Sequence, residues 1–249
     1  MTSSREAAFP LGAAVTIAEL EEDPHPVLAR LREREPVSWL PALDGWLVTR
    51  RDLALEVMRD DDTYTVDDPR FSTAQVVGPS MLSLDGTVHA AHRDPFARAF
   101  RLEAVRERFT QLVADETDRL LDAVAAAGRT DLRRSLAGPL AVTAMMAALG
   151  LDETPPATVL GWYEAIVGAV TDITAGLEAP AAGQAAFDEL RASIVPALER
   201  DPRASLVAAA AGEAGGLTRP EVVSNAAVLL FGGIETTEGM IANALLHVL

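Results

Sequence analysis

The sequence predicts a mainly α-helical fold with one small β-hairpin near the N-terminus. Two short runs of β-branched, aromatic and aliphatic residues flank an Asp-Gly pair, which is a strong hairpin signal. From about residue 87 onward, apolar residues recur at helical spacing, and Gly or Pro residues separate the segments. With 49% hydrophobic residues, the 249-residue chain is long enough to bury a large core.

The first 86 residues predict a mixed α/β region. The segment 60–80 carries acids, Pro69, Gly78 and Pro79 and shows little periodicity, so it predicts a loop. The turn of the hairpin is placed at Asp44-Gly45. The elements expected here are a helix over 26–35 after Asp23-Pro24, strands over 37–40 and 46–49, and a helix starting at Asp52.

The pattern over residues 87–249 predicts a helical region. We expect this region and residues 1–86 to be parts of one domain. The last helix has a strong start, with Thr218 as its cap, Pro220 in the first turn and Glu221 three residues after the cap. The expected helices are 87–100, 103–127, 135–149, 156–177, 184–199, 203–211 and 219–249.

The last helix extends to Leu249 without a capping residue, and its final residues are mostly apolar. A long helix with such an end needs a packing partner that these 249 residues do not provide. We therefore expect the chain to be a fragment of a longer protein.

Composition excludes several classes of function. The chain has no cysteine, so by itself it cannot form a disulfide, a thiolate metal site or a cysteine-ligated haem, and no metal ligands are expected within it. Its net charge of −16 argues against a surface that binds nucleic acid. The start of the chain lacks a signal-peptide pattern, and the longest uncharged run, 136–151, is too short to span a membrane. A cytoplasmic protein without a membrane or nucleic-acid partner is expected.

A first chemical motif lies inside the last predicted helix, in the run Phe231-Gly-Gly-Ile-Glu-Thr-Thr237. Two adjacent glycines allow a close backbone approach, a kink or a bulge. The Glu235 carboxyl and the Thr236 hydroxyl that follow would form a polar notch able to bind a small ligand and relay protons. The alternative is plain helix–helix packing at the glycines, with Glu235 in solvent.

A second motif, His89-x-x-x-Arg93, follows Leu84-Asp85-Gly86. Residues four apart share a helical face, so the imidazole and the guanidinium could together bind a carboxylate or a phosphate. The alternative is that both side chains are simply solvated.

The two motifs in this order resemble the bacterial cytochrome P-450 family. The likeness continues through Asp23-Pro-His-Pro26, Gly45-Trp-Leu-Val48 and Arg70-Phe-Ser72, and it covers the whole chain in collinear order. It implies an incomplete cytochrome P-450 fold, as found in the actinobacterial enzymes, that ends within the long oxygen-binding helix. The C-terminal region that ligates the haem is absent from this sequence.

The resemblance implies roles for individual residues. Glu235 and Thr236 match the acid–alcohol pair that delivers protons to oxygen, and they are the expected catalytic residues. His89 and Arg93 match the residues that bind a haem propionate. The expected haem-binding residues are Met81, Leu82, His89, Arg93, Phe100, Leu229, Gly232 and Gly233.

The resemblance also indicates where substrate and redox partner would bind. Residues 154–200 match the helices that cover the substrate, and the expected contacts include Val228, Trp162 and Ile166, with Tyr163 and Ile173 as further candidates. An arginine-rich stretch from Arg93 to Arg108 resembles the surface on which an acidic ferredoxin docks; its alternative is a solvated face.

The implied activity is that of a haem-thiolate monooxygenase. It would insert one oxygen atom from O2 into a small organic molecule, in secondary metabolism, with electrons from a ferredoxin and its reductase. The cofactor would be haem b, with its iron ligand a cysteine beyond residue 249. The alternative is a naturally truncated, inactive protein with a binding or structural role.

Overall fold

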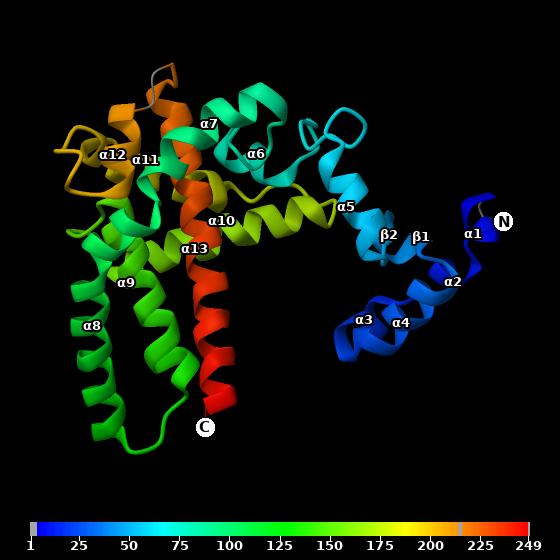
Figure 1. The fold of residues 1–249 in the computed structure, drawn as a ribbon, viewed down its shortest axis with the longest axis horizontal. Helices are drawn as coiled ribbons and strands as arrows, with labels where there is room; N and C mark the ends of the chain where they lie inside the picture. The colour runs from blue at the N-terminus through cyan, green and yellow to red at the C-terminus, as the bar shows by residue number, and fades with distance from the viewer. Residues whose placement is uncertain (1–3, 214–215, 249) are drawn as a thin grey trace. The chain divides into compact units, whose positions relative to one another are not determined.

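A computed structural model describes residues 4–213 and 216–248, and it divides the chain into two compact units, Met1–Thr65 and Val66–Leu249. Figure 1 labels the elements of both units. The division falls before residue 86, where the sequence placed the change from a mixed to a helical region. The organisation as part of one domain stays a prediction.

The first unit contains short helices around a two-stranded antiparallel hairpin. The strands pair with Val37 opposite Val48 and Leu40 opposite Gly45, which confirms the predicted hairpin. The connection is longer than a two-residue turn, because a 3₁₀ turn precedes Asp44, whose φ is +45°. The elements are α1 (Ser4–Ala8), α2 (Pro10–Ala13), α3 (Ile17–Glu22), α4 (Pro24–Arg34), β1 (Val37–Leu40), η1 (Pro41–Leu43), β2 (Gly45–Val48) and α5 (Arg51–Arg59).

A small core of Val15, Val27, Leu31 and Leu40 holds this unit together. Helices α1 to α3 were not predicted, because they are short and their apolar positions show no long period. Local polar contacts define α3, which begins at a reciprocal capping box between Thr16 and Glu19.

The second unit is built of helices. Its elements are α6 (Ser72–Val77), α7 (Gly86–Ala99), α8 (Leu102–Ala127), the π-helical turn η2 (Arg133–Ala137), α9 (Gly138–Leu149), α10 (Pro156–Thr174), α11 (Ala181–Leu198), α12 (Leu206–Glu213) and α13 (Arg219–Val248). The prediction of a loop over 60–80 was wrong in part, because α6 lies within it. Val76 and Val77 are buried against the main core, and this packing stabilises a helix too short to show a period.

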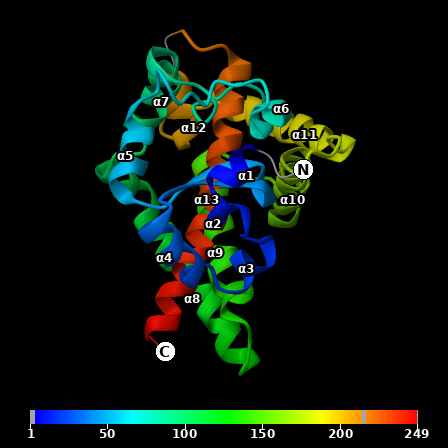
Figure 2. The ribbon, with the colours of Figure 1, turned by 90° about the vertical axis from the view of Figure 1, so that its right-hand side faces the viewer.

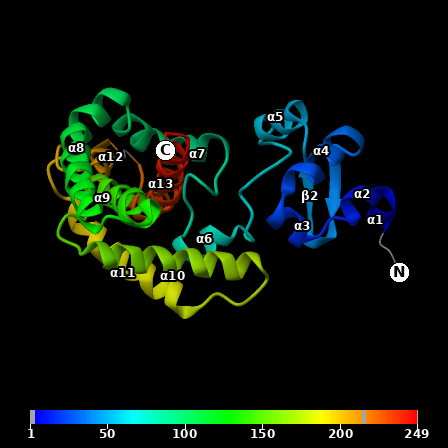
Figure 3. The same cartoon turned by 90° about the horizontal axis from the view of Figure 1, so that it is seen from below.

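The main core lies between α13, α9 and the hairpin formed by α10 and α11. Figure 3 shows α10 and α11 side by side, and Figure 2 shows α12 beside α7. Gly183 permits the close approach in the helical hairpin, since a Cβ there would lie 2.3 Å from the Cβ of Ala169. Among the described residues, no helix is both long enough and apolar enough to cross a lipid bilayer.

Helix α13 is the central element of the predicted site. It is α-helical over 30 residues without interruption at Gly232-Gly233, so the glycines do not break it. Its start is as predicted, because Thr218 and Glu221 form reciprocal contacts: the Glu221 carboxylate accepts from the Thr218 backbone N–H at 2.6 Å and from its hydroxyl at 2.7 Å.

Candidate functional site

A cavity of about 220 Å³ lies where α7 and α13 meet the loop before α7. Its lining brings together residues that are far apart in the sequence. They are Met81, Arg93, Phe96, Ala97, Phe100 and Leu229. Four of them, Met81, Arg93, Phe100 and Leu229, are among the residues expected to bind haem. The structure thus collects these predicted residues around one apolar cavity with a single cation at its wall.

The two residues of the His89-x-x-x-Arg93 motif are placed differently. Arg93 is exposed and lines the cavity, and within residues 4–213 and 216–248 it has no carboxylate partner. His89 is half-buried one turn earlier on α7 and is not among the lining residues. Leu82 is also outside the lining, with 46% of its surface exposed. An unpaired guanidinium beside an apolar wall is suited to bind an acidic group of a mostly apolar ligand.

A buried polar network behind the cavity was not foreseen from the sequence. The fully buried Asn225 side chain accepts from the backbone N–H of Met81 at 2.7 Å and donates to the Glu221 carbonyl at 2.8 Å. Its amide also lies 3.0 Å from Nδ1 of the buried His92. Because every polar atom of a buried amide needs a partner, Asn225 fixes the Met81 loop and α7 onto α13. No local pattern marks this residue as more than a polar position on a helix.

The two glycines of the first motif have different surroundings. A Cβ on Gly233 would meet Sδ of Met145 in α9 at 2.2 Å, whereas a Cβ on Gly232 would have no neighbour within 4 Å. The helix-packing alternative therefore applies to Gly233. Gly232 leaves open space beside the helix, three residues after the cavity residue Leu229 and on the same face.

The acid and the hydroxyl that follow the glycines do not contact each other directly. The Thr236 hydroxyl donates to the carbonyl of Gly232 one turn earlier on α13. The Glu235 carboxylate accepts a hydrogen bond at 3.2 Å from the hydroxyl of Tyr163, which is on α10. Burial, followed by the negative charge of Glu235, raises the pKa of Tyr163 to about 12. The phenol is therefore protonated and able to donate at neutral pH.

The residues expected to contact substrate lie mainly in the core. Ile166 is fully buried, and Trp162, 7% exposed, donates from its indole N–H to Glu189 of α11 at 2.7 Å. Val228 is half-buried against the same core. Packing between α10, α11 and α13 accounts for these positions without a ligand, so contact with substrate stays a prediction.

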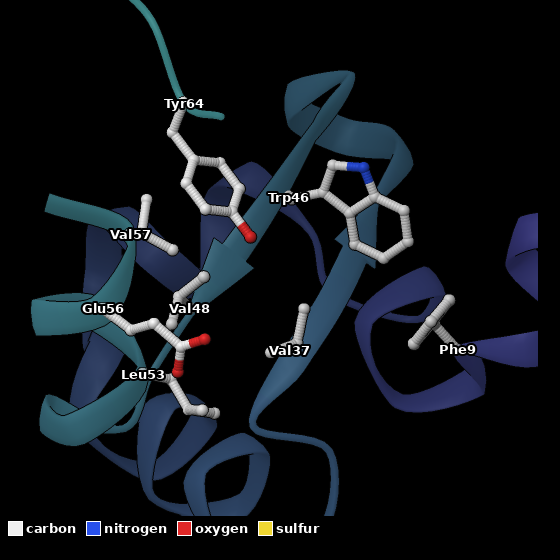
Figure 4. Close-up of a pocket in the computed structure, with 8 residues that line it drawn as sticks. All are labelled: Phe9, Val37, Trp46, Val48, Leu53, Glu56, Val57 and Tyr64. Carbon is white, nitrogen blue, oxygen red and sulfur yellow. The ribbon is translucent and has the colours of Figure 1, made fainter. Parts of the chain in front are cut away.

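A larger cavity, about 510 Å³, lies within the first unit (Figure 4). Its lining consists of side chains of the hairpin and α5, together with Phe9 and Tyr64, and Glu56 is its acidic member. None of the residues expected to bind haem or substrate is among those that line it.

Comparisons with known proteins agree with the geometry. No model of a protein family matches the chain. It is 31% identical over 242 residues to the cytochrome P-450 monooxygenase PikC of Streptomyces venezuelae, covering 90% of this chain and 55% of PikC. It is 28% identical to a vitamin D(3) 25-hydroxylase of Pseudonocardia autotrophica, covering 92% and 58%. The crystal structure of CalO2 superposes with a TM-score of 0.72 at 25% identity, covering 92% of this chain and 60% of that one.

The chain matches the N-terminal part of bacterial cytochrome P-450 proteins. It has the N-terminal part of the cytochrome P-450 fold and spans 55 to 60% of the length of these relatives. The mainly helical fold and the likeness to cytochrome P-450 proteins were therefore predicted correctly. The Asn225 network and the Tyr163–Glu235 contact were not, because both join segments distant in the sequence.

Proposed function

We propose that the chain is part of a haem-thiolate monooxygenase that inserts one oxygen atom from O2 into a small organic substrate. In this reaction the second oxygen atom leaves as water, and two electrons and two protons are consumed. The observation that carries the proposal is the cavity at α7 and α13, where an unpaired Arg93 stands beside apolar side chains. The similarity to PikC, named as a monooxygenase, supports the same reaction class.

The residues present fit a haem edge. Haem b is a flat apolar macrocycle with two propionates, and the cavity offers Met81, Phe100 and Leu229 to the ring and Arg93 to a propionate. When bound, haem supplies the iron at which oxygen is activated. Because these 249 residues contain no cysteine, we propose that the thiolate ligand comes from outside them.

Glu235 and Thr236 would move protons. Thr236 follows Leu229 and Gly232 along one face of α13. Its side chain is therefore on the same face of the helix as the cavity residue Leu229. Glu235 is exposed and can exchange protons with water. In the proposed reaction, the Glu235 carboxylate would take a proton from solvent, and a water molecule would carry it to the Thr236 hydroxyl on the cavity side of α13.

The substrate is proposed to be a small, mostly apolar molecule of secondary metabolism. Val228, Trp162 and Ile166, which lie in the core beside α10 and α13, are proposed to shape its site. The vitamin D(3) 25-hydroxylase is named for a mostly apolar compound, which supports an apolar class of substrate and not the identity of the substrate. An acidic ferredoxin is proposed as the electron donor.

The test is haem retention in the complete protein, compared among Arg93→Ala, His89→Ala and Arg106→Ala. Arg106 is an exposed arginine on α8 outside the cavity and serves as the control. Arg93→Ala should weaken haem retention about tenfold, because a charge-assisted hydrogen bond to a propionate is lost. His89→Ala should have a smaller effect, since His89 does not line the cavity, and Arg106→Ala should have none.

The absorption spectrum of the reduced, CO-bound protein completes the test. A thiolate-type Soret band is expected from the wild-type protein. Its absence from the complete protein would contradict the monooxygenase and favour the inactive binding protein. Haem retention in Arg93→Ala equal to that of the wild type would remove Arg93 from the haem site.

A further inference from the structure

Tyr163 of α10 makes two contacts with one face of α13. Its ring packs against that of Phe231, with centroids 6.4 Å apart and planes at 49°, and its hydroxyl donates to Oε2 of Glu235 at 3.2 Å. Phe231 and Glu235 are four residues apart and therefore lie one above the other on α13. The ring contact fixes the direction of the phenol, and the hydroxyl then reaches the carboxylate.

Glu235 has no comparable support from its own helix. The Thr236 hydroxyl is bonded to the Gly232 carbonyl, and the next acid, Glu238, pairs with Arg133 at 2.8 Å. In the part of the chain that the structure describes, Tyr163 is the side chain that hydrogen-bonds to Glu235. A carboxylate on an exposed helix surface would otherwise turn freely among its rotamers.

The contact directs the carboxylate toward α10. Leu229, Gly232 and Thr236 form the face of α13 that leads from the cavity at α7 and α13. Phe231 and Glu235 each precede a residue of this face by one position, so they are turned from it by about 100°. With Tyr163 in place, Glu235 stays on the α10 side of this face. Arg133 and Glu238 are the other charged groups that act on the phenol, one with a positive and one with a negative charge.

We propose that Tyr163 is a positioning residue that holds the Glu235 carboxylate on the α10 side of α13 during proton delivery. This role rests on the proposed monooxygenase function.

The contact is tested first without turnover, in the complete protein. A fluorinated tyrosine, whose more acidic phenol titrates while the protein is folded, is placed at position 163 and its pKa is followed by fluorine NMR. The same probe at the exposed Tyr64 is the matched control. The pKa at position 163 should exceed that at 64 and fall in Glu235→Gln, because the carboxylate charge disfavours the phenolate. No change at position 163 in Glu235→Gln would overturn the contact.

The positioning role is tested next in the haem-loaded protein. Tyr163→Phe keeps the ring and its packing and removes only the donor, and Tyr64→Phe is the control. Tyr163→Phe should keep the wild-type haem content and CO spectrum. It should also raise the share of electrons that appear as hydrogen peroxide about three- to tenfold, the net worth of one ordinary exposed hydrogen bond, and should change the pH profile of that share.

The outcomes separate the inference from the proposed function. Peroxide formation in Tyr163→Phe equal to that of the wild type at every pH would overturn the positioning role. A complete protein without the thiolate-type CO spectrum would instead overturn the monooxygenase. In that case the fluorine titration still decides whether Tyr163 holds Glu235.

Discussion

At the scale of single residues, Gly232 and Gly233 show that two adjacent glycines of one helix can have different surroundings. Helix geometry alone assigns both the same cost of roughly 1 kcal/mol relative to alanine. Met145 of α9 occupies the space beside Gly233, while the space beside Gly232 is open. A tightly packed position and an open one are therefore adjacent on α13.

Substitution of each glycine by alanine should change stability in opposite directions. Gly233→Ala should destabilise the protein by about 1–2 kcal/mol, because overpacking against Met145 outweighs the gain in helix propensity. Gly232→Ala should raise stability by about 0.5–1 kcal/mol. Urea unfolding followed by circular dichroism measures both. Equal effects would show that Met145 can move aside without cost.

At the scale of elements, the N-terminus of α13 is defined by residues close together in the sequence. The contacts of its surface are defined by the helices and loops that pack against it. The Thr218–Glu221 box was predicted from spacing, because its contacts join residues three apart. The contacts from Asn225 to Met81 and from Glu235 to Tyr163 join residues 144 and 72 positions apart. No periodicity in the sequence reports contacts of this range.

Loss of this cap should have a pH-dependent cost. The hydrogen bonds from Thr218 lower the pKa of Glu221 below its ordinary value of 4.5. A carboxyl with a lowered pKa stabilises the folded state above its ordinary value and ceases to do so as the pH falls through the lowered one. Thr218→Ala should thus cost about 1 kcal/mol at neutral pH and less in acid. Urea unfolding at the two pH values measures this.

Thr237→Ala is the matched control for that experiment, since Thr237 is exposed within the same helix. It should change stability little and equally at both pH values. A cost of Thr218→Ala that is the same in acid would show that the Thr218 hydroxyl does not act through the Glu221 carboxylate.

At the largest scale, the net charge of −16 on these 249 residues opposes the approach of an acidic ferredoxin. In the predicted docking stretch from Arg93 to Arg108, fewer arginines are available to a partner than the sequence contains. Arg108 donates to the carbonyls of Pro202 and Arg203 at 2.9 and 2.8 Å, and Arg93 lines the cavity. Arg101 and Arg106 are exposed arginines of this stretch, and neither has an ion pair among the residues that the structure describes.

The sign of the salt dependence tests the docking proposal. If Arg101 and Arg106 steer an acidic ferredoxin, its association rate should fall as ionic strength rises. The rate should also fall severalfold in the double variant Arg101→Ala, Arg106→Ala, whereas Arg51→Ala, an exposed arginine of α5, should leave it unchanged. Stopped-flow reduction kinetics measure the rate. A rate that rises with salt would mean that net repulsion outweighs local attraction.

The sequence by itself determined the helical class, the hairpin, the start of α13 and the likeness to cytochrome P-450 proteins. These depend on interactions within a few residues or on motifs in fixed order. Tertiary structure decided the rest: α6 forms because Val76 and Val77 are buried, Met145 occupies the space beside Gly233, and Glu235 meets Tyr163 rather than solvent alone. The physical reason is that each of these outcomes depends on a neighbour from another helix.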